Sequence, residues 1–173
     1  MVERRGTKEH KLQYQHNMLN RIRKWLGDGD VSFREVRHGV TRTSEESALA
    51  RGEELRTGGK ALLIKVDDVF RLFVLSADRK LDSAALKQYF GARKSRFATA
   101  EELLELTGLV PGSVPPFGAP VLPLPLYVDP SVFENERIAF NAGSLTDSII
   151  MEVEDYRRVA GAEIFRFAVS PDS

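Results

Sequence analysis

Two β-rich apolar runs in the middle of the chain limit the folds open to it. Residues 60–66 (KALLIKV) and 69–76 (VFRLFVLS) are separated only by Asp67 and Asp68. Two such runs joined by two polar residues predict a β-hairpin, although Asp-Asp suits a tight turn less well than Asp-Gly. We therefore expect a β-sheet that contains this hairpin.

Helix signals lie on both sides of the hairpin. Thr43-Ser-Glu-Glu46 and Thr99-Ala-Glu-Glu102 are capping boxes, in which the Thr hydroxyl and the Glu carboxylate satisfy unpaired N–H groups at a helix start. Asp82 is a third cap, and glycines at 27, 52, 91 and 108 are suitable helix ends. The predicted helices are 8–26, 43 to about 52, 82–90, 99–107 and 154–160, and further strands are predicted at 31–37, 124–128, 137–141 and 163–169.

These elements mix without a strict βαβ rhythm, which indicates an α/β (α+β) fold with a mixed β-sheet flanked by helices. The 173 residues suit a single domain, 1–173, that can bury about 70% of its unfolded surface without a metal or disulfide staple. The absence of Cys excludes a disulfide scaffold, a Cys-ligated zinc and a Cys nucleophile. A composition of 42% hydrophobic and 29% charged residues is typical of a soluble globular protein.

The charges of the chain balance, with 25 Lys+Arg against 25 Asp+Glu, which argues against non-specific coating of nucleic acid. The segment around the predicted helix 8–26 is nevertheless basic, and it could either contact a phosphate backbone or be a solvated face. Residues 110–128 are apolar but are broken by six prolines, so no membrane helix is expected there. The start MVERRGTKEH shows no signal peptide, and a cytoplasmic location is the expectation.

Most conventional catalytic patterns are missing from the sequence. HExxH, GxxxxGK[ST] and GxGxxG do not occur, and a Ser-His-Asp site would need His10, His16 or His38 as its base. His10 and His16 fall in the basic segment and are expected to be surface residues. His38 follows a predicted strand and could line a cleft or lie in a solvated loop.

Three other features could carry chemistry. The stretch 107–118 holds three glycines and three prolines, and such a rigid loop can present backbone N–H groups to an oxygen without reorganisation. Lys60 follows Gly58-Gly59 at the start of an apolar strand, where its ammonium could project into a cleft. Asn141-Ala-Gly143-Ser144 is a polar turn after a strand. Taken singly, these features are better explained as ordinary turns or a solvated side chain.

Taken together and in this order, the segments GGKALLIKV, SADRKLD, ATAEELLELTGLVPGSVPPFG and LYVDPSVFENERIAFNAGS resemble the YbaK/ProX family. These are prolyl-tRNA-synthetase-associated editing domains, free-standing aminoacyl-tRNA deacylases. The resemblance runs from the strand at residue 31 to about residue 160. It implies a YbaK-like mixed α/β fold that hydrolyses the ester of a mischarged tRNA, with no metal and no cofactor. The spacing ARGEELRTGGKAL is most similar to the subgroup related to YeaK and the Ser/Thr-editing members.

The resemblance also implies which residues form the site. The family's active-site lysine falls on Lys60, its GxxxP loop on Gly112 to Pro116, and its Asn-Ala-Gly turn on Asn141 to Gly143. We therefore assign catalytic roles to Lys60, Gly112, Ser113 and Pro116. Substrate-binding roles are assigned to His38, Thr43, Val114, Pro115, Phe117, Gly118, Asn141, Ala142, Gly143 and Ser144. The basic N-terminal segment and the Pro-rich residues 119–125 depart from the family pattern.

In the mechanism we expect, loop amides hold the aminoacyl carbonyl or the terminal ribose, and Lys60 supplies positive charge near the ester or the terminal phosphate. A hydroxyl of the substrate's ribose would orient or deprotonate the water. Ser, Thr and Ala are the leading amino acids, with Cys the runner-up. The expected partner is the acceptor end of an aminoacyl-tRNA. An aminoacyl-tRNA synthetase is a second candidate partner. The alternatives are a non-catalytic tRNA- or synthetase-binding module and a generic small-molecule esterase.

Overall fold

The computed structural model describes residues 17–172. Its centre is the expected hairpin, β2 (Gly59–Val66) and β3 (Val69–Ser76), which pair antiparallel from Val66↔Val69 to Gly59↔Ser76. Asp67 takes a positive φ of 51° in the turn, and its carboxylate accepts bonds from the N–H groups of Arg93 and Lys94. Tertiary contacts therefore support a turn that is unfavourable by sequence.

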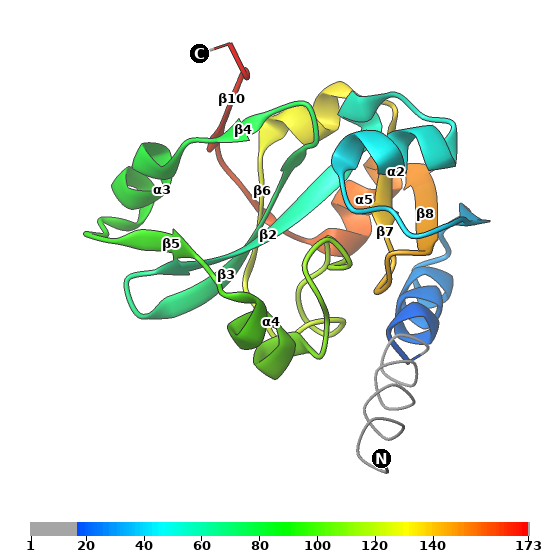
Figure 1. Cartoon of the computed structure of the whole chain (residues 1–173), viewed down its shortest axis with the longest axis horizontal. Coiled ribbons are helices and arrows are strands. Elements are labelled where there is room, and N and C mark those ends of the chain that lie inside the picture. Colours follow the sequence, from blue (N-terminus) through cyan, green and yellow to red (C-terminus); the bar gives the residue numbers. More distant parts are fainter. Residues whose placement is uncertain (1–16, 173) are drawn as a thin grey trace.

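The hairpin belongs to a five-stranded mixed sheet, which confirms the expected fold class. The strand order is β5-β2-β3-β6-β9, with β5 (Ser95–Phe97) antiparallel to β2, and with β6 (Leu126–Val128) and β9 (Glu163–Ile164) parallel to their neighbours. Figure 1 shows the hairpin crossing the middle of the molecule, with β5 towards one end and β7 and β8 towards the other.

A second sheet is entirely antiparallel. It has the order β1-β8-β7, formed by β1 (Phe33–Arg37), β8 (Asp147–Glu152) and β7 (Arg137–Asn141). A parallel bridge between Gly58 and Ala139 brings β7 against the start of β2. The sequence analysis predicted β1 and β7 but missed β8.

The helices that start at Ser44, Ser83 and Ala100 begin and end at the expected caps, whereas the helix predicted at 154–160 starts one residue earlier and has no side-chain cap. These helices are α2 (Ser44–Arg51), α3 (Ser83–Phe90), α4 (Ala100–Thr107) and α5 (Val153–Ala160), with short 3-10 helices η1 (Leu55–Thr57) and η2 (Pro130–Glu134). Residues 17–28 form a further helix that continues one residue past Gly27; the rest of the predicted helix 8–26, including His10 and His16, lies outside the described residues. No helix within 17–172 has both the length and the apolar character needed to cross a membrane.

The predicted closing strand 163–169 was wrong in one respect, because it is two short strands with different partners. β9 pairs with β6, whereas β10 (Ala168–Val169) pairs with β4 (Lys80–Leu81). The chain leaves the main sheet between them because the buried carboxylate of Asp129 accepts the N–H groups of Phe167 and Ala168, at 2.8 and 2.9 Å. The strand predicted at 124–128 begins only at Leu126.

Candidate functional site

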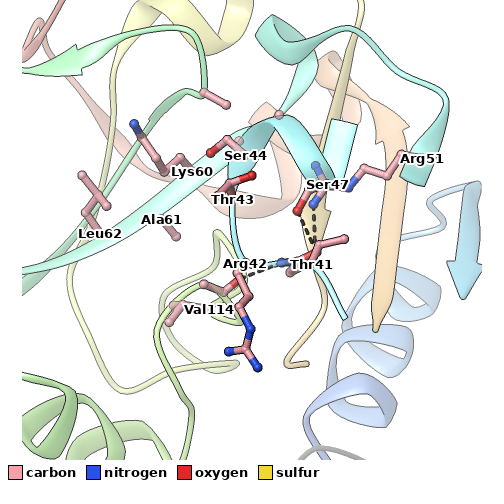
Figure 2. Close-up of a pocket in the computed structure, with 15 residues that line it drawn as sticks. Thr41, Arg42, Thr43, Ser44, Ser47, Arg51, Lys60, Ala61, Leu62 and Val114 are labelled. Atoms are coloured by element: carbon pink, nitrogen blue, oxygen red, sulfur yellow. Dashed lines mark hydrogen bonds between the residues drawn. The ribbon is translucent and has the colours of Figure 1, made fainter. Parts of the chain in front are cut away.

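Three walls enclose a pocket beside β2, on the side of this strand that faces away from β3 (Figure 2). One wall is the start of α2 with the residues before it, the second is the first half of β2, and the third is the loop that contains Gly112. The pocket has a volume of about 140 Å³. Its lining residues are Thr41, Arg42, Thr43, Ser44, Ser47, Arg51, Gly58, Gly59, Lys60, Ala61, Leu62, Ala77, Gly112, Val114 and Asn141.

The α2 wall is rich in hydroxyl groups. Thr43 is the N-cap of α2, and its hydroxyl accepts a bond from Glu46 N–H at 3.1 Å. The Glu46 carboxylate accepts instead from the N–H of Arg42, so the capping box is completed one residue earlier than predicted. Ser47 Oγ donates to Thr41 Oγ1 at 2.8 Å, which fixes two neighbouring hydroxyls in the wall.

Lys60 comes from β2, immediately after two closely packed glycines. A Cβ on Gly59 would lie only 2.5 Å from Ile138 Cδ1, so a glycine is needed for β7 to pack here. The half-buried Lys60 Nζ donates to the carbonyl of Arg79 at 3.2 Å. Burial lowers the pKa of Lys60, and the nearby carboxylates of Glu45 and Asp78 only partly oppose this effect.

Three carbonyl groups of the Gly112 loop accept hydrogen bonds from other elements of the fold. Gly112 O accepts from Asn141 Nδ2 at 2.7 Å, Ser113 O accepts from Gly143 N–H at 2.9 Å, and Pro116 O accepts from the buried Tyr156 hydroxyl at 2.7 Å. Gly112 has a φ of +86°, a conformation that favours glycine. Within residues 17–172, the N–H groups of Gly112 and Val114 donate to no other protein group. The loop therefore has a fixed path, and two of its pocket-lining residues have a backbone N–H group with no acceptor among residues 17–172.

Arg51 connects the α2 wall to this loop. Its Nε donates to Ser148 Oγ at 2.9 Å and its Nη2 to Asn141 Oδ1 at 3.0 Å. The guanidinium is buried, which lowers the pKa of Arg51 to about 10. His38 Nε2 also lies 2.8 Å from Ser148 Oγ. Arg51 thus orients the side chain whose amide holds Gly112.

This architecture matches a known family. The aminoacyl-tRNA editing domain matches residues 38–159. The chain belongs to this family. Membership confirms the YbaK/ProX resemblance, and with it the expectation of a hydrolase that deacylates aminoacyl-tRNA.

Individual proteins that resemble this chain support the same family assignment. The chain is 37% identical over 147 residues to the multifunctional Ser/Thr-tRNA deacylase ProXp-y of Escherichia coli, covering 82% of this chain and 87% of the relative. It is also 37% identical over 101 residues to a proline–tRNA ligase of Shouchella clausii, covering 58% of this chain and 18% of the ligase. A solved structure described as a candidate trans-editing enzyme for prolyl-tRNA synthetase superposes with a TM-score of 0.77 at 26% identity, over 88% of this chain and 98% of the other.

Some residues assigned from the sequence meet in the editing-domain pocket and others do not. Lys60, Thr43, Gly112, Val114 and Asn141 line it. Outside its lining lie His38, Ser113, Pro115, Pro116, Phe117, Gly118, Ala142, Gly143 and Ser144. His38 is engaged with Ser148 and the Gly39 carbonyl. The other eight are buried in the packing behind the pocket.

The buried residues make contacts that hold the loop and the turn after β7 in place. Ser113 Oγ donates to Val110 O at 2.7 Å, and the Phe117 ring packs edge-on against Phe140 and Tyr156. A Cβ on Gly118 would lie 2.7 Å from Leu124 O. Ser144 Oγ donates to Asp147 Oδ2 within its own turn.

The sequence analysis missed part of the lining. The unpredicted members are Thr41, Arg42, Ser44, Ser47, Arg51, Gly58, Gly59, Ala61, Leu62 and Ala77. Arg42, Ser44, Gly59 and Ala61 adjoin a predicted residue, and the capping box at Thr43 was the available signal for the α2 wall. Arg51 had no such signal, because its partners Asn141 and Ser148 are about a hundred residues away in sequence, at separations of 90 and 97. The described residues contain no group of three or more His, Asp or Glu side chains arranged to hold a metal ion.

Proposed function

We propose that this editing domain hydrolyses the ester of tRNA mischarged with a small hydroxylated amino acid, serine or threonine. The observation that carries the proposal is one pocket that combines Lys60, spare loop N–H donors and a wall of hydroxyl groups. Hydroxyls both donate and accept hydrogen bonds, so this wall can pair with the side-chain hydroxyl of Ser or Thr. The similarity to the Ser/Thr-tRNA deacylase supports the same substrates.

The size of the pocket supports a small aminoacyl group. Sites for drug-sized ligands have volumes of roughly 300–1,000 Å³. At about 140 Å³, this pocket suits the amino acid alone, with the nucleotide outside. Serine and threonine differ by one methyl group, which is discriminated by only about 1–3 kcal/mol, so both can be accepted. Alanine lacks the hydroxyl and leaves the wall without its hydrogen-bond partner, and large residues are rejected by steric clash. Cysteine remains the less favoured substrate because its thiol is a weak hydrogen-bond partner.

In the proposed mechanism, water attacks the ester carbonyl carbon while an N–H group of Gly112 or Val114 donates to the developing oxyanion. The bond between this carbon and the ribose oxygen then breaks, and the ribose oxygen takes a proton, leaving free amino acid and tRNA. The Lys60 ammonium stabilises negative charge near the ester or the terminal phosphate. No histidine in the described part of the chain, residues 17–172, lines the pocket, so a neighbouring ribose hydroxyl orients the attacking water.

The acceptor end of an aminoacyl-tRNA is the partner that this mechanism requires. Related domains occur within proline–tRNA ligases, which supports a synthetase as a further partner. We place the protein in the cytoplasm because its proposed substrates are made there.

Deacylation of a panel of charged tRNAs that differ only in the amino acid tests the proposal. Wild-type protein should release Ser and Thr fastest, Lys60→Ala should lose at least about 10²-fold in rate, and Gly112→Ala should also be impaired. Lys65→Ala is the matched control, because Lys65 lies on the same strand beside the Phe70 ring and outside the pocket. Full activity of folded Lys60→Ala would contradict the assigned site.

The pH dependence offers a second measurement on Lys60. Because burial lowers its pKa, the ammonium should be lost, and the enzymatic rate should fall, at a pH below the 10.5 of an ordinary lysine. Lys60→Arg should move this fall to higher pH, after the spontaneous hydrolysis of the ester is subtracted. If the protein binds charged tRNA but releases no amino acid in a single-turnover assay, it is a non-catalytic module. If it hydrolyses simple esters without tRNA, it is a general esterase.

A further inference from the structure

Among residues 17–172, the edge of β2 that faces away from β3 is covered at both ends, but no strand pairs with its middle. At one end β5 pairs with residues 64–66, and Ala98 N–H donates to Leu63 O at 2.9 Å. At the other end Gly58 forms its bridge to Ala139 of β7. Thr99 then starts the cap of α4, which takes the chain away from β2. Between these two contacts lies Ala61, half-buried and lining the pocket.

The register shows where the main-chain groups of Ala61 point. In a strand, the N–H and C=O of one residue point to one side and those of the next residue point to the other. Gly58 O accepts from Ala77 N–H, beyond the end of β3, whereas Leu63 O accepts from Ala98 on the opposite side. The pairing of β2 with β3 is continuous, with no bulge. Ala61 therefore shares the orientation of Leu63, and its N–H and C=O point away from β3 towards the pocket.

We propose that the main-chain N–H and C=O of Ala61 form a subsite that pairs with the ester carbonyl and the α-ammonium of the aminoacyl group. This rests on the function proposed above. An aminoacyl group carries the same donor and acceptor pair as a strand residue, and paired antiparallel residues exchange both bonds. In Figure 2, Ala61 lies across the pocket from Thr41 and Ser47, so a substrate paired with it can direct its side chain to the hydroxyl wall.

The subsite also completes the stabilisation of the oxyanion. A carbonyl oxygen has two lone pairs, so it can accept from Ala61 N–H and from a Gly112-loop N–H together. The Ala61 carbonyl meanwhile holds the α-ammonium, a bond between a charged donor and a neutral acceptor. The subsite thus recognises the feature common to all aminoacyl esters, while the hydroxyl wall distinguishes the side chains.

An amide-to-ester replacement at residue 61 tests the N–H directly. Substituting lactic acid for Ala61 removes one N–H group and keeps the methyl side chain. The hydrogen bonds between β2 and β3 stay intact, because this N–H points away from β3. We expect kcat/KM for seryl-tRNA to fall about 10²-fold, as for loss of one oxyanion donor. The matched control is leucic acid at Leu63, which lies on the same edge outside the pocket and should change kcat/KM less than threefold. Equal rates for the residue-61 ester and the wild type would overturn the proposal.

A binding measurement separates this subsite from the proposed function. With a non-hydrolysable 3′-seryl-amide of adenosine bound, the Ala61 amide proton should shift and exchange more slowly, while the Leu63 amide should not. An Ala61 amide unchanged by the bound analogue would contradict the subsite and leave deacylation intact. Failure of the wild type to hydrolyse any charged tRNA would instead refute the proposed function.

Discussion

Arg51 shows how a single buried charge can organise a site by holding other side chains in place. Its hydrogen bonds within residues 17–172 go to neutral oxygens, on Ser148 and Asn141. Burying a guanidinium against neutral partners costs desolvation free energy, which is also why its pKa is lowered. In return, Arg51 fixes the orientation of the Asn141 amide, and this amide in turn fixes the Gly112 carbonyl. Arg51 is therefore a positioning residue.

Replacing Arg51 should reduce activity more than stability. Arg51→Met loses two charge-assisted bonds but also removes a desolvated charge, so unfolding free energy should change by no more than about 2 kcal/mol. Asn141 then loses its orientation, and kcat should fall about tenfold or more, with a smaller effect on KM. Deacylation kinetics and thermal unfolding measure both quantities.

Two further variants separate positioning from general destabilisation. Arg51→Lys keeps the charge but cannot reproduce the planar fork, so it should restore only part of the activity. Arg34→Met removes an arginine that pairs with Glu53 outside the pocket and should leave deacylation unchanged. Equal losses of kcat in the Arg34 and Arg51 variants would contradict a positioning role.

At the scale of elements, the turn after β7 connects the pocket to the helix 17–28. Gly143 has a φ of +89°, and a Cβ placed on it would lie 2.5 Å from Met18 Cγ. Met18 and Leu19 of that helix are buried in the main hydrophobic core. The Asn-Ala-Gly turn therefore has two functions in the fold. Asn141 faces the pocket, and Gly143 allows the helix to approach.

Gly143→Ala should destabilise the protein through both strain and overpacking. A left-handed backbone costs a non-glycine residue about 1–2 kcal/mol, and overpacking adds about 1–3 kcal/mol, so we expect a total loss of at least about 2 kcal/mol. Gly27→Ala is the matched control, because Gly27 lies in the helix 17–28 and no atom of the described residues would lie within 4 Å of the added Cβ. It should stabilise the fold by about 0.5–1 kcal/mol. Denaturant unfolding of both variants checks the signs, and a neutral Gly143→Ala would show that the helix can move.

Local signals explain which elements could be predicted. Caps at Thr43, Asp82 and Thr99 act on N–H groups two or three residues away, so the sequence contains the whole interaction. The hairpin was predictable for the same reason. By contrast, β9 and β10 are separate strands because of a carboxylate about 40 residues earlier.

The candidate site follows the same division. Lys60 and the Gly112 loop could be placed through a resemblance to known editing domains. Ala61 could not, because an alanine has no side-chain chemistry and its importance depends on which strand edge stays open. Arg51 likewise depends on partners brought together only by the fold. The missed residues are those whose contribution comes from position rather than from residue type.

Over the whole molecule, Asp129 joins segments that are far apart in sequence. Asp129 is 3% exposed, and its carboxylate uses both oxygens: Oδ1 accepts from Ser131 N–H, and Oδ2 accepts from Phe167 and Ala168 N–H. Its own N–H donates to Val74 O on β3. One residue, through its backbone and its side chain, thus connects the mixed sheet, η2 and the C-terminal segment that forms the β4–β10 pair.

Asp129→Asn should therefore be markedly destabilising although it is nearly isosteric. An amide has one accepting oxygen, so its NH2 group must face at least one buried N–H donor. Losing a bond to a charged acceptor and stranding a donor costs about 1.5–3 kcal/mol. A loss of that size should lower Tm by roughly 4–10 °C in a chain of this length. The amides of Phe167 and Ala168 should exchange faster by NMR, because their acceptor is weakened.

Asp82→Asn supplies the comparison within the same chain. Asp82 caps α3 through Oδ1 alone, which accepts from both Ala84 and Ala85 N–H, and asparagine is as good an N-cap as aspartate. Its Tm should stay within about 2 °C of the wild type, since the Asn carbonyl can replace Oδ1. Equal Tm changes for the two variants would mean that charge, and not the number of accepting oxygens, determines the effect. Unchanged exchange at Phe167 and Ala168 in Asp129→Asn would show that β10 is held in place by other contacts.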